Sequence, residues 1–219
     1  MIKSFHAYVR RPVRFDYLLA LQDGTPMRSV LDVGCGNGSP VLTKTYYPDC
    51  IYHGIEKSGR MLTAADLAAI DRLFELDLEK DDLQLIEDEA YDCVIASHVI
   101  EHLPDAIPLL RQLAGKLRRG GILYLESPSE ASVRFPSMPG TLNFHDDPTH
   151  VRLYSRDEVC ATLNECECTV VKSTVRRSLK RILLFPLHVL YSLWVYHELR
   201  GTVFWDILGF ASVVIAKKS

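Results

Sequence analysis

The stretch Val30-Leu31-Asp32-Val33-Gly34-Cys35-Gly36-Asn37-Gly38 joins a short apolar run to a loop with glycine at alternate positions. The run from Ser29 to Val33 is too short for a helix and predicts a buried strand. Glycines directly after such a strand let a ligand lie against bare backbone, because side chains there would collide with it. The stretch therefore predicts a parallel α/β sheet whose first strand ends at a ligand site.

The composition is that of an ordinary globular protein, with 219 residues, 47% hydrophobic and 24% charged. The formal net charge of −3 gives no reason to expect a nucleic acid partner. From Val171 to the end, however, eight Lys/Arg stand against two Asp/Glu. This local excess of basic residues is typical of a surface that meets anionic groups.

The cysteines and the apolar runs bear on the compartment. Six cysteines without a CxxC pair predict free structural thiols rather than disulfides or a zinc site. The N-terminal stretch Met1–His6 lacks the apolar core of a signal peptide. The longest apolar run, Ile182–Tyr196, is shorter than the ~20 residues that span a bilayer. Together these features predict a cytoplasmic protein.

Strand-like runs alternate with helical patterns along most of the chain. The expected strands are Ser29–Val33, Ile51–Ile55, Leu73–Leu76, Tyr91–Ala96, Ile122–Leu125, Thr169–Val175 and Phe210–Ala216. The expected helices cover Ala64–Phe74, Leu109–Leu117 and a segment that starts at the capping-box sequence Ser155–Glu158. This alternation predicts a parallel sheet with helices on both faces, and the two late strands predict an antiparallel pair at one edge.

Polar residues follow each of the first four expected strands. Asp32 and the glycines follow the first, Glu56 the second, Asp77 the third and Ser97-His98 the fourth. In parallel sheets ligands bind beyond the carboxyl ends of the strands. An acid after the second strand can accept hydrogen bonds from both hydroxyls of a ribose. Each acid alone also suits a helix cap, but their joint appearance favours a nucleoside with a charged tail.

In this order and spacing, the motifs resemble the class I S-adenosylmethionine-dependent methyltransferases, in particular the type 11/type 23 group. The resemblance runs from Ser29 to Ser127 and includes the segment Tyr91–Leu103 and Gly120-Gly121-Ile122-Leu123. The later stretch His145–Ser155 also resembles the segment that follows the fifth strand in that group. The resemblance implies a Rossmann-like fold: a parallel seven-stranded sheet with an antiparallel last strand and helices on both faces. It also implies S-adenosylmethionine as cofactor, with S-adenosylhomocysteine as product.

The resemblance assigns cofactor binding to Asp32, Gly34, Cys35, Gly36, Gly38, Glu56, Asp77, Leu78, Ser97 and His98. Glu56 would hold the ribose, Asp77 would accept from the adenine amine with Leu78 against the ring, and the glycine loop would approach the methionine part. Asp32 would act on the ammonium group; the alternative is a structural acid that organises the loop. NAD is the rival cofactor, but its loop reads G-x-G-x-x-G and here Ser39 follows an early third glycine.

The domain boundaries follow from the same resemblance. We expect a single methyltransferase domain over residues 1–219, with its cofactor-binding core at 29–127. Residues 140–219 would then supply a substrate-side loop, the late strands and an apolar helical insert.

The expected reaction is methyl transfer to a small-molecule acceptor. An Asn-Pro-Pro-Tyr motif after the fourth strand would indicate nucleobase amines, and Ser97-His98-Val99-Ile100 stands there instead. This favours an oxygen nucleophile, for which His102, His150 and His145 are the candidate bases, because an unperturbed histidine titrates near ~6.5. For His102 the alternative is a structural role in its helix. A non-catalytic protein that binds S-adenosylmethionine on the same fold is the alternative function.

No metal is expected. Some quinone-directed methyltransferases carry Glu-x-x-Glu-His after the fourth strand, and this chain has His98 in place of the first Glu.

The last unusual feature is an apolar run with a basic flank. Lys172, Arg176, Arg177, Lys180 and Arg181 come before or at its start. The side chains that fit one helical face are Leu179, Ile182, Leu183, Leu187, Leu190 and Trp194. A basic amphipathic helix predicts contact of residues 176–196 with a membrane surface or a lipid-linked substrate. The alternative is a helix pair that packs on the edge of the sheet.

Overall fold

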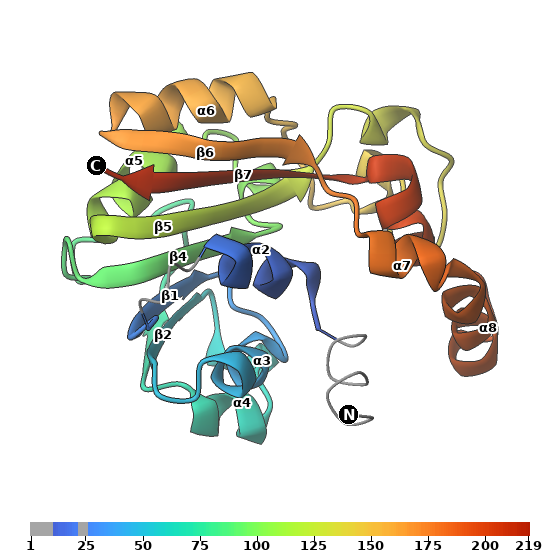
Figure 1. Cartoon of the computed structure of the whole chain (residues 1–219), viewed down its shortest axis with the longest axis horizontal. Coiled ribbons are helices and arrows are strands. Elements are labelled where there is room, and N and C mark those ends of the chain that lie inside the picture. The colour runs from blue at the N-terminus through green and yellow to red at the C-terminus, as the bar shows by residue number, and fades with distance from the viewer. Residues whose placement is uncertain (1–10, 22–25) are drawn as a thin grey trace.

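Seven strands form one sheet in the computed structural model, which describes residues 11–21 and 26–219 (Figure 1). The strands are β1 (Ser29–Val33), β2 (Ile51–Glu56), β3 (Arg72–Glu75), β4 (Tyr91–Ser97), β5 (Leu117–Pro128), β6 (Cys168–Val175) and β7 (Ala211–Lys218). Their order is β3-β2-β1-β4-β5-β7-β6. The stretch Met1–His6, which enters the expectation of a cytoplasmic protein, lies outside the described residues.

The expected topology is confirmed. Strands β1 to β5 pair in parallel, and β7 lies between β5 and β6 and runs antiparallel to both. The order of the strands reverses between β1 and β4, so the carboxyl ends of these two strands flank the crevice where such sheets bind ligands. The sheet is thus Rossmann-like, with an antiparallel last strand.

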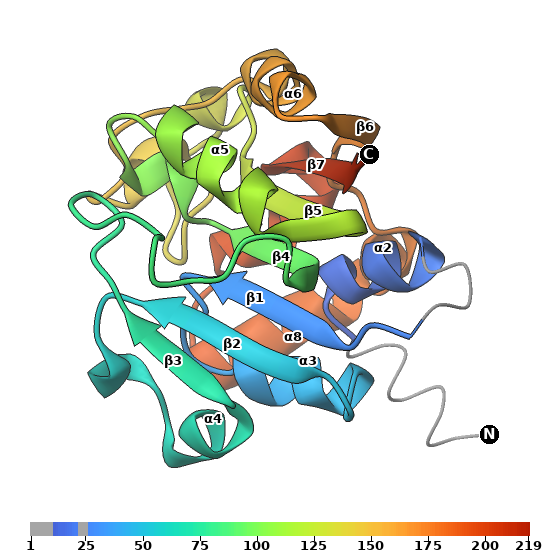
Figure 2. The same cartoon turned by 90° about the vertical axis from the view of Figure 1, so that its left-hand side faces the viewer.

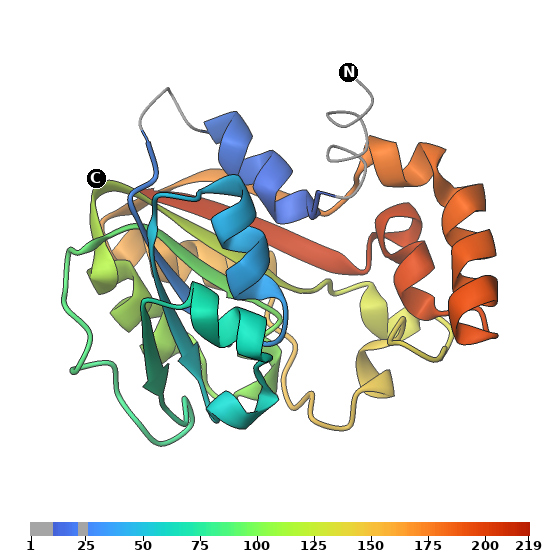
Figure 3. The ribbon, with the colours of Figure 1, turned by 90° about the horizontal axis from the view of Figure 1, so that it is seen from below.

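Helices cover both faces of the sheet. They are α2 (Val13–Leu21), α3 (Ser39–Tyr46), α4 (Ala64–Ala69), α5 (Ile107–Lys116), α6 (Arg156–Glu165), α7 (Leu179–Leu183) and α8 (Phe185–Tyr196). Short turns of helix are η1 (Gly59–Met61), η2 (Ile100–His102), η3 (Ser132–Arg134), η4 (Phe144–Asp146), η5 (Gly201–Phe204) and η6 (Trp205–Gly209). Helices α5 and α6 lie on one face and α2 and α3 on the other (Figure 2), with α4 beside α3 (Figure 3).

Each face has its own apolar core. Leu110, Leu113 and Leu163 of α5 and α6 are fully buried against one face of the sheet. Phe15 and Leu18 of α2 are fully buried against the other face. A strand that is covered on both faces needs apolar residues on both, which explains why the strand sequences read as nearly continuous apolar runs.

Two expected element boundaries are wrong. The helix expected over Ala64–Phe74 ends at Ala69, because the chain turns extended at Ile70 and Arg72 begins β3 opposite His53 of β2. The fifth strand begins at Leu117 rather than Ile122, although α5 does end at Lys116, just before the expected stop signal. Pairing with β4 therefore starts before Gly120-Gly121, and the register shifts across them.

The N-terminus of α6 begins at the expected cap. The Ser155 hydroxyl accepts a hydrogen bond from the Glu158 backbone N–H at 3.1 Å. The Glu158 carboxylate, which would complete a capping box, pairs instead with Arg152 at 2.5 Å. The hydrogen bond from the Glu158 N–H to Ser155 is thus present as expected, but the return bond from the Glu158 side chain is replaced by the pair with Arg152, which holds the loop before α6.

The apolar run Ile182–Tyr196 forms two helices rather than one. Helix α7 ends at Leu183, and α8 begins at Phe185 with Pro186 in its first turn. Proline lacks the backbone N–H that would continue a helix and suits the first turn of a new one. In the described part of the chain, no helix combines the length and apolar character needed to cross a membrane.

Candidate functional site

A cleft of about 330 Å³ opens at the carboxyl ends of the parallel strands. It is lined by Gly34, Ile55, Glu56, Lys57, Leu76, Asp77, Leu78, Glu79, His98, Val99, His102 and Leu103. Six of the residues singled out from the sequence therefore meet in one place: Gly34, Glu56, Asp77, Leu78, His98 and His102.

The glycine loop brings backbone to the wall of this cleft. Gly34 has a φ of +61°, and a Cβ on it would lie 2.8 Å from Cγ2 of Val99, so only glycine fits. The Gly36 N–H donates to Oε2 of Glu56 at 3.1 Å. Gly38, at the N-terminus of α3, donates its N–H to Oδ1 of Asp66 at 3.0 Å. The loop is thus held from two sides, by the ends of β2 and α4.

Two acids face the cleft from neighbouring strands. Glu56 ends β2, and its Oε1 also accepts a hydrogen bond from the Lys57 N–H at 3.0 Å. Asp77 follows β3 and pairs with Lys57 at 3.1 Å and Lys80 at 3.2 Å. The hydrogen bond from Lys57 lowers the pKa of Asp77, so this carboxyl is ionised at neutral pH. Two acceptor-only groups on one wall suit a ligand with several donors, such as a nucleoside.

Asp32 and Cys35 lie behind the cleft rather than on its wall. The Asp32 carboxylate is 2% exposed and accepts hydrogen bonds from the Ser39 hydroxyl and, at 2.7 Å, from the Tyr52 hydroxyl. Burial raises the pKa of Asp32, and it raises the pKa of the Cys35 thiol to about 12. This geometry is that of the structural acid which was the alternative for Asp32. The thiol of Cys35 stays protonated and packs as a small apolar group.

His98 occupies a strained and highly charged position after β4. Its φ is +56°, and its backbone N–H donates to the Glu126 carbonyl at 2.8 Å. Its Nδ1 lies 3.0 Å from Oε1 of Glu101, and its Nε2 lies 3.3 Å from Oε1 of Glu126. Burial would lower the pKa of His98, but the two carboxylates raise it to about 9. The ring is therefore an imidazolium that donates from both nitrogens.

The Glu126 carboxylate also pairs with Arg176, the residue that directly follows β6. Arg176 donates to Oε1 of Glu126 at 2.5 Å and to Oδ2 of Asp206 at 3.3 Å. The Tyr124 hydroxyl also donates to the Glu126 carboxylate. Burial alone would raise the pKa of Glu126, but Arg176 and His98 hold it well below the ordinary value. This buried network joins the ends of β4 and β5, the stretch between β6 and α7, and η6.

Sequence reasoning missed Glu126, Arg176 and Asp206 as parts of the site. The signal for Glu126 was an acid that directly follows the expected apolar strand Ile122–Leu125. Arg176 and Asp206 carried no comparable signal, because the residues that pair with them lie 50 and 30 positions away along the chain. Ser97, expected to follow the fourth strand, is the last residue of β4, and its buried hydroxyl has no hydrogen-bond partner among the described residues.

Two of the three candidate bases lie side by side. The rings of His102 and His150 are 4.9 Å apart. His102 Nδ1 lies 2.9 Å from the Thr149 hydroxyl, which itself donates to Asp147 at 2.6 Å. His150 Nδ1 lies 2.7 Å from the carbonyl of Phe144. Since these partners accept hydrogen bonds, both Nδ1 atoms donate. Nε2 of His150 lies 3.9 Å from Oδ2 of Asp147.

His145 is not part of this cluster. Its side chain is exposed and borders a separate hollow formed with Ser137–Thr141 and Asp146. Its ring packs edge-on against Phe144 at 5.3 Å. Asp146 instead holds this loop in place, because its carboxylate accepts four hydrogen bonds, which include those from Ser137 and Leu142. Burial would raise the pKa of Asp146, but these hydrogen bonds lower it to about 2.

One group of side chains has the donor set for a divalent cation. Glu101, His102 and His150 each place one ligand atom within 4.8 Å of the others. Oε2 of Glu101 is buried and has no hydrogen-bond partner among the described residues. The sequence-based expectation that no metal is bound stays a prediction.

A family model described as a methyltransferase domain matches residues 5–173. Among curated relatives, a ubiquinone biosynthesis O-methyltransferase of Vibrio vulnificus is 30% identical over 123 residues, which cover 53% of this chain and 50% of that protein. The enzyme of the same name from Xanthomonas campestris is 30% identical over 146 residues, 61% of this chain and 55% of that protein. The chain thus spans about half the length of the curated relatives it matches.

Solved structures show the same fold. A SAM-dependent methyltransferase from Archaeoglobus fulgidus superimposes with a TM-score of 0.62 at 20% identity and 99% coverage of both chains. An O-methyltransferase from Brevibacillus brevis in complex with S-adenosyl-L-homocysteine gives a TM-score of 0.60 at 17% identity, over 94% of this chain and 71% of that one. The family model matches residues 5–173, which is most of the chain. The chain therefore belongs to the class I S-adenosylmethionine-dependent methyltransferases.

Proposed function

We propose that this methyltransferase transfers its methyl group to a hydroxyl oxygen of a small molecule. The observation that carries the proposal is His102, which lines the same cleft as Glu56 and Asp77 and packs with its ring 4.9 Å from that of His150. The curated relatives that it matches are named for O-methylation, which supports an oxygen nucleophile.

The cleft suits S-adenosylmethionine, which supplies an electrophilic methyl group on a sulfonium when bound. Glu56 would accept from the ribose hydroxyls, and Asp77 from the adenine amine with Leu78 against the ring. The backbone of Gly34 and Gly36 would approach the methionine part. Val99 and Leu103 would exclude water, and alignment of this kind supplies ~7–11 kcal/mol of barrier lowering in favourable cases.

His102 is the candidate general base. The Asp147–Thr149 pair holds the proton of His102 on Nδ1, so Nε2 is free to accept the proton of an acceptor hydroxyl. His150 lies next to it, with its own Nδ1–H fixed by the Phe144 carbonyl, and would contact the acceptor. His98 is occupied by two carboxylates and is no base at neutral pH.

We also propose that the protein acts in the cytoplasm, on the evidence of its cysteines. All six cysteines are free thiols, as a reducing compartment keeps them.

The test is turnover with a panel of acceptors in which phenols, catechols and sugars are matched with amines of similar shape. Formation of S-adenosylhomocysteine only with hydroxyl compounds supports the proposal. Consumption only with amines contradicts it. Bound donor that is never consumed would favour a non-catalytic binding protein. Running each assay with and without a chelator also tests the expectation that no metal is needed.

A further inference from the structure

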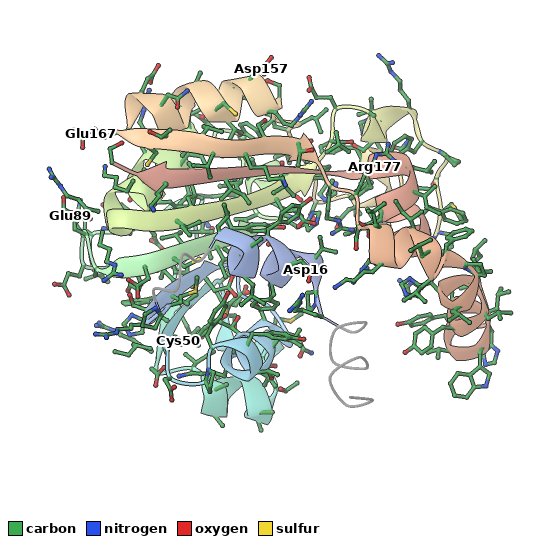
Figure 4. All side chains as sticks on the ribbon, viewed as in Figure 1. Asp16, Cys50, Glu89, Asp157, Glu167 and Arg177 are labelled. Atoms are coloured by element: carbon green, nitrogen blue, oxygen red, sulfur yellow. The ribbon has the colours of Figure 1, made fainter. Side chains whose placement is uncertain are left out.

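Helices α7 and α8 carry a surface of exposed apolar side chains, here called the apolar surface. It consists of Leu179, Leu183, Leu187, Leu190, Tyr191, Leu193, Trp194, Val195 and Tyr196. Trp194 is 78% exposed and Leu183 is 79% exposed. The helical face recognised in the sequence thus points away from the domain, and only Ile182 of its six members is half-buried. Side chains stand out from α8 on the outer side of the molecule (Figure 4).

The packed side of α8 is narrow. Phe185, His188, Val189 and Ser192 are its less exposed residues, and at about 3.6 residues per turn they fall on one side of the helix. The ring of Phe185 packs at a tilt against that of Phe204, with centroids 5.4 Å apart, and the Ser192 hydroxyl accepts from the Arg200 N–H at 3.1 Å. The remaining circumference, more than half of it, presents apolar side chains outward. Patches of this kind mark interaction sites in soluble proteins.

We propose that the apolar surface inserts into the surface of a lipid bilayer. A second protein or a second copy would cover one stripe of a helix, as ridges packed into grooves do. A bilayer instead surrounds a helix from several sides, which matches the wide exposed arc. Tyr191, Trp194 and Tyr196 have the ring and polar tip that suit the boundary between headgroups and acyl chains. The 12 residues of α8 extend about 18 Å, which allows insertion into one leaflet.

Charge on this segment favours an anionic bilayer. No Asp or Glu occurs between Arg177 and His197, and the next acid, Glu198, follows the end of α8. Arg177 is exposed at the start of the segment (Figure 4). A surface without acids approaches anionic headgroups without repulsion, and each nearby cation adds attraction.

The base of the segment is fixed to the domain, so the apolar surface is presented rigidly. Lys180 pairs with Asp16 of α2 at 2.6 Å, and the Ser178 N–H donates to Asp206 at 3.1 Å. Three of the basic residues expected from the sequence to face a membrane thus lie against acids inside the fold: Arg176, Lys180 and Arg181, which is 3.9 Å from Asp206. The contact with lipid rests on the apolar side chains, and the charges orient it.

The experiment is co-sedimentation of the full chain with vesicles of phosphatidylcholine, with and without phosphatidylglycerol. The test variant is Leu187→Ser, Leu190→Ser and Trp194→Ser combined. The matched control is Met61→Ser with Leu85→Ser, which removes two apolar side chains that are 71% and 73% exposed elsewhere. Circular dichroism of each protein shows that the helices persist.

The wild type and the control should sediment with vesicles, more strongly when phosphatidylglycerol is present. The triple variant should bind roughly tenfold or more weakly, because it removes three large apolar groups from the contact. Wild type that stays in the supernatant, or a triple variant that binds like the control, overturns the proposal. One further result overturns it: the wild type binds no vesicles but forms a dimer in sedimentation velocity, and the triple variant is a monomer. A second copy of the chain then covers this surface.

Discussion

The guanidinium of Arg176 lies 2.5 Å from the carboxylate of Glu126, and this contact joins the stretch between β6 and α7 to the carboxyl-terminal part of β5. Glu126 in turn accepts from His98, which lines the cleft. Trp205 closes the arrangement, with its ring 5.1 Å from His98 and the Arg176 guanidinium 5.1 Å above it. The segment therefore reaches the cleft through its base, while α8 itself lines no part of it.

Replacing Arg176 with Met should destabilise the fold. The substitution leaves Glu126 and Asp206 buried without their shared cation, and breaking a buried pair in this way costs about 3–5 kcal/mol. Urea unfolding measures the loss. The neighbouring exposed Arg177, replaced in the same way, serves as control and should cost about 0.5 kcal/mol or less. Equal effects of the two variants would show that the network contributes no more than a surface charge.

The stability should fall at alkaline pH through His98. Its pKa in the fold is raised to about 9, above the ordinary 6.5, so the imidazolium stabilises the native state. This contribution is fully present below about pH 6.5 and is lost as the pH rises through about 9. Its size is on the order of 1–3 kcal/mol.

The variant His98→Asn tests this assignment, because Asn tolerates the positive φ at this position. Urea unfolding at about pH 6, 8 and 10 should show a flatter profile for the variant than for the wild type. Parallel profiles would assign the pH dependence to other groups.

Glu56→Ala should weaken binding of S-adenosylhomocysteine and leave the fold intact. The change removes the proposed ribose acceptor, a contact worth about 1.5–3 kcal/mol or roughly 10- to 100-fold in Kd. It also removes the acceptor of the Gly36 N–H, which adds to the loss of affinity. Calorimetry with the purified protein measures the change. Glu75→Ala is the matched control, because Glu75 ends the neighbouring strand β3 and lines no part of the cleft. If Glu56→Ala binds as tightly as the control, the ribose lies elsewhere.

The fold could be predicted well from the sequence because its signals are local. Each apolar run, beginning with Ser29–Val33, predicts one strand, and the motifs at the ends of these runs predict a parallel sheet. Boundaries differ from the expected ones where tertiary pairing decides. Residues 70–74 have helical spacing, but pairing with β2 makes Arg72–Glu75 a strand. Helices α2 and α3 were not predicted, although Pro40 in the first turn of α3 is a helix-start signal.

The candidate site could be predicted only in part. Glycine loops and acids at strand ends are sequence motifs, and Gly34, Glu56 and Asp77 do meet in the cleft. Asp32 illustrates the limit, because a carboxylate one residue inside the strand points to buried partners, Ser39 and Tyr52, that no spacing rule identifies. The pairing of Arg176 with Glu126 depends on how β7 inserts between β5 and β6, which the sequence does not spell out.

His102→Gln should reduce the turnover of a hydroxyl acceptor by about 10²- to 10⁴-fold, because a positioned base is lost. Binding of S-adenosylhomocysteine should stay unchanged. The pH profile of kcat/KM should also lose the limb that reports protonation of the base in the wild type. A much smaller effect is expected for His145→Gln, since His145 borders a separate hollow. A wild-type pH profile retained by His102→Gln would leave that histidine with a structural role.

Replacing Leu179–Tyr196 with a short Gly/Ser linker should separate acceptor delivery from cofactor binding. The deletion removes α7 and α8 but keeps Arg176, Glu126 and Asp206, so the network that supports His98 survives. The cleft contains no residue of the deleted segment, and affinity for S-adenosylhomocysteine should be preserved.

The deleted segment follows the carboxyl end of β6, which lies at the same end of the sheet as the carboxyl ends of the parallel strands and the cleft. We therefore expect the segment to bring a lipid-soluble acceptor to the site. Turnover of a water-soluble acceptor should then persist, while turnover of an acceptor carried in vesicles should fall by roughly tenfold or more, as weaker membrane contact requires. Equal turnover of the vesicle-borne acceptor before and after deletion would exclude a role for this segment in delivery.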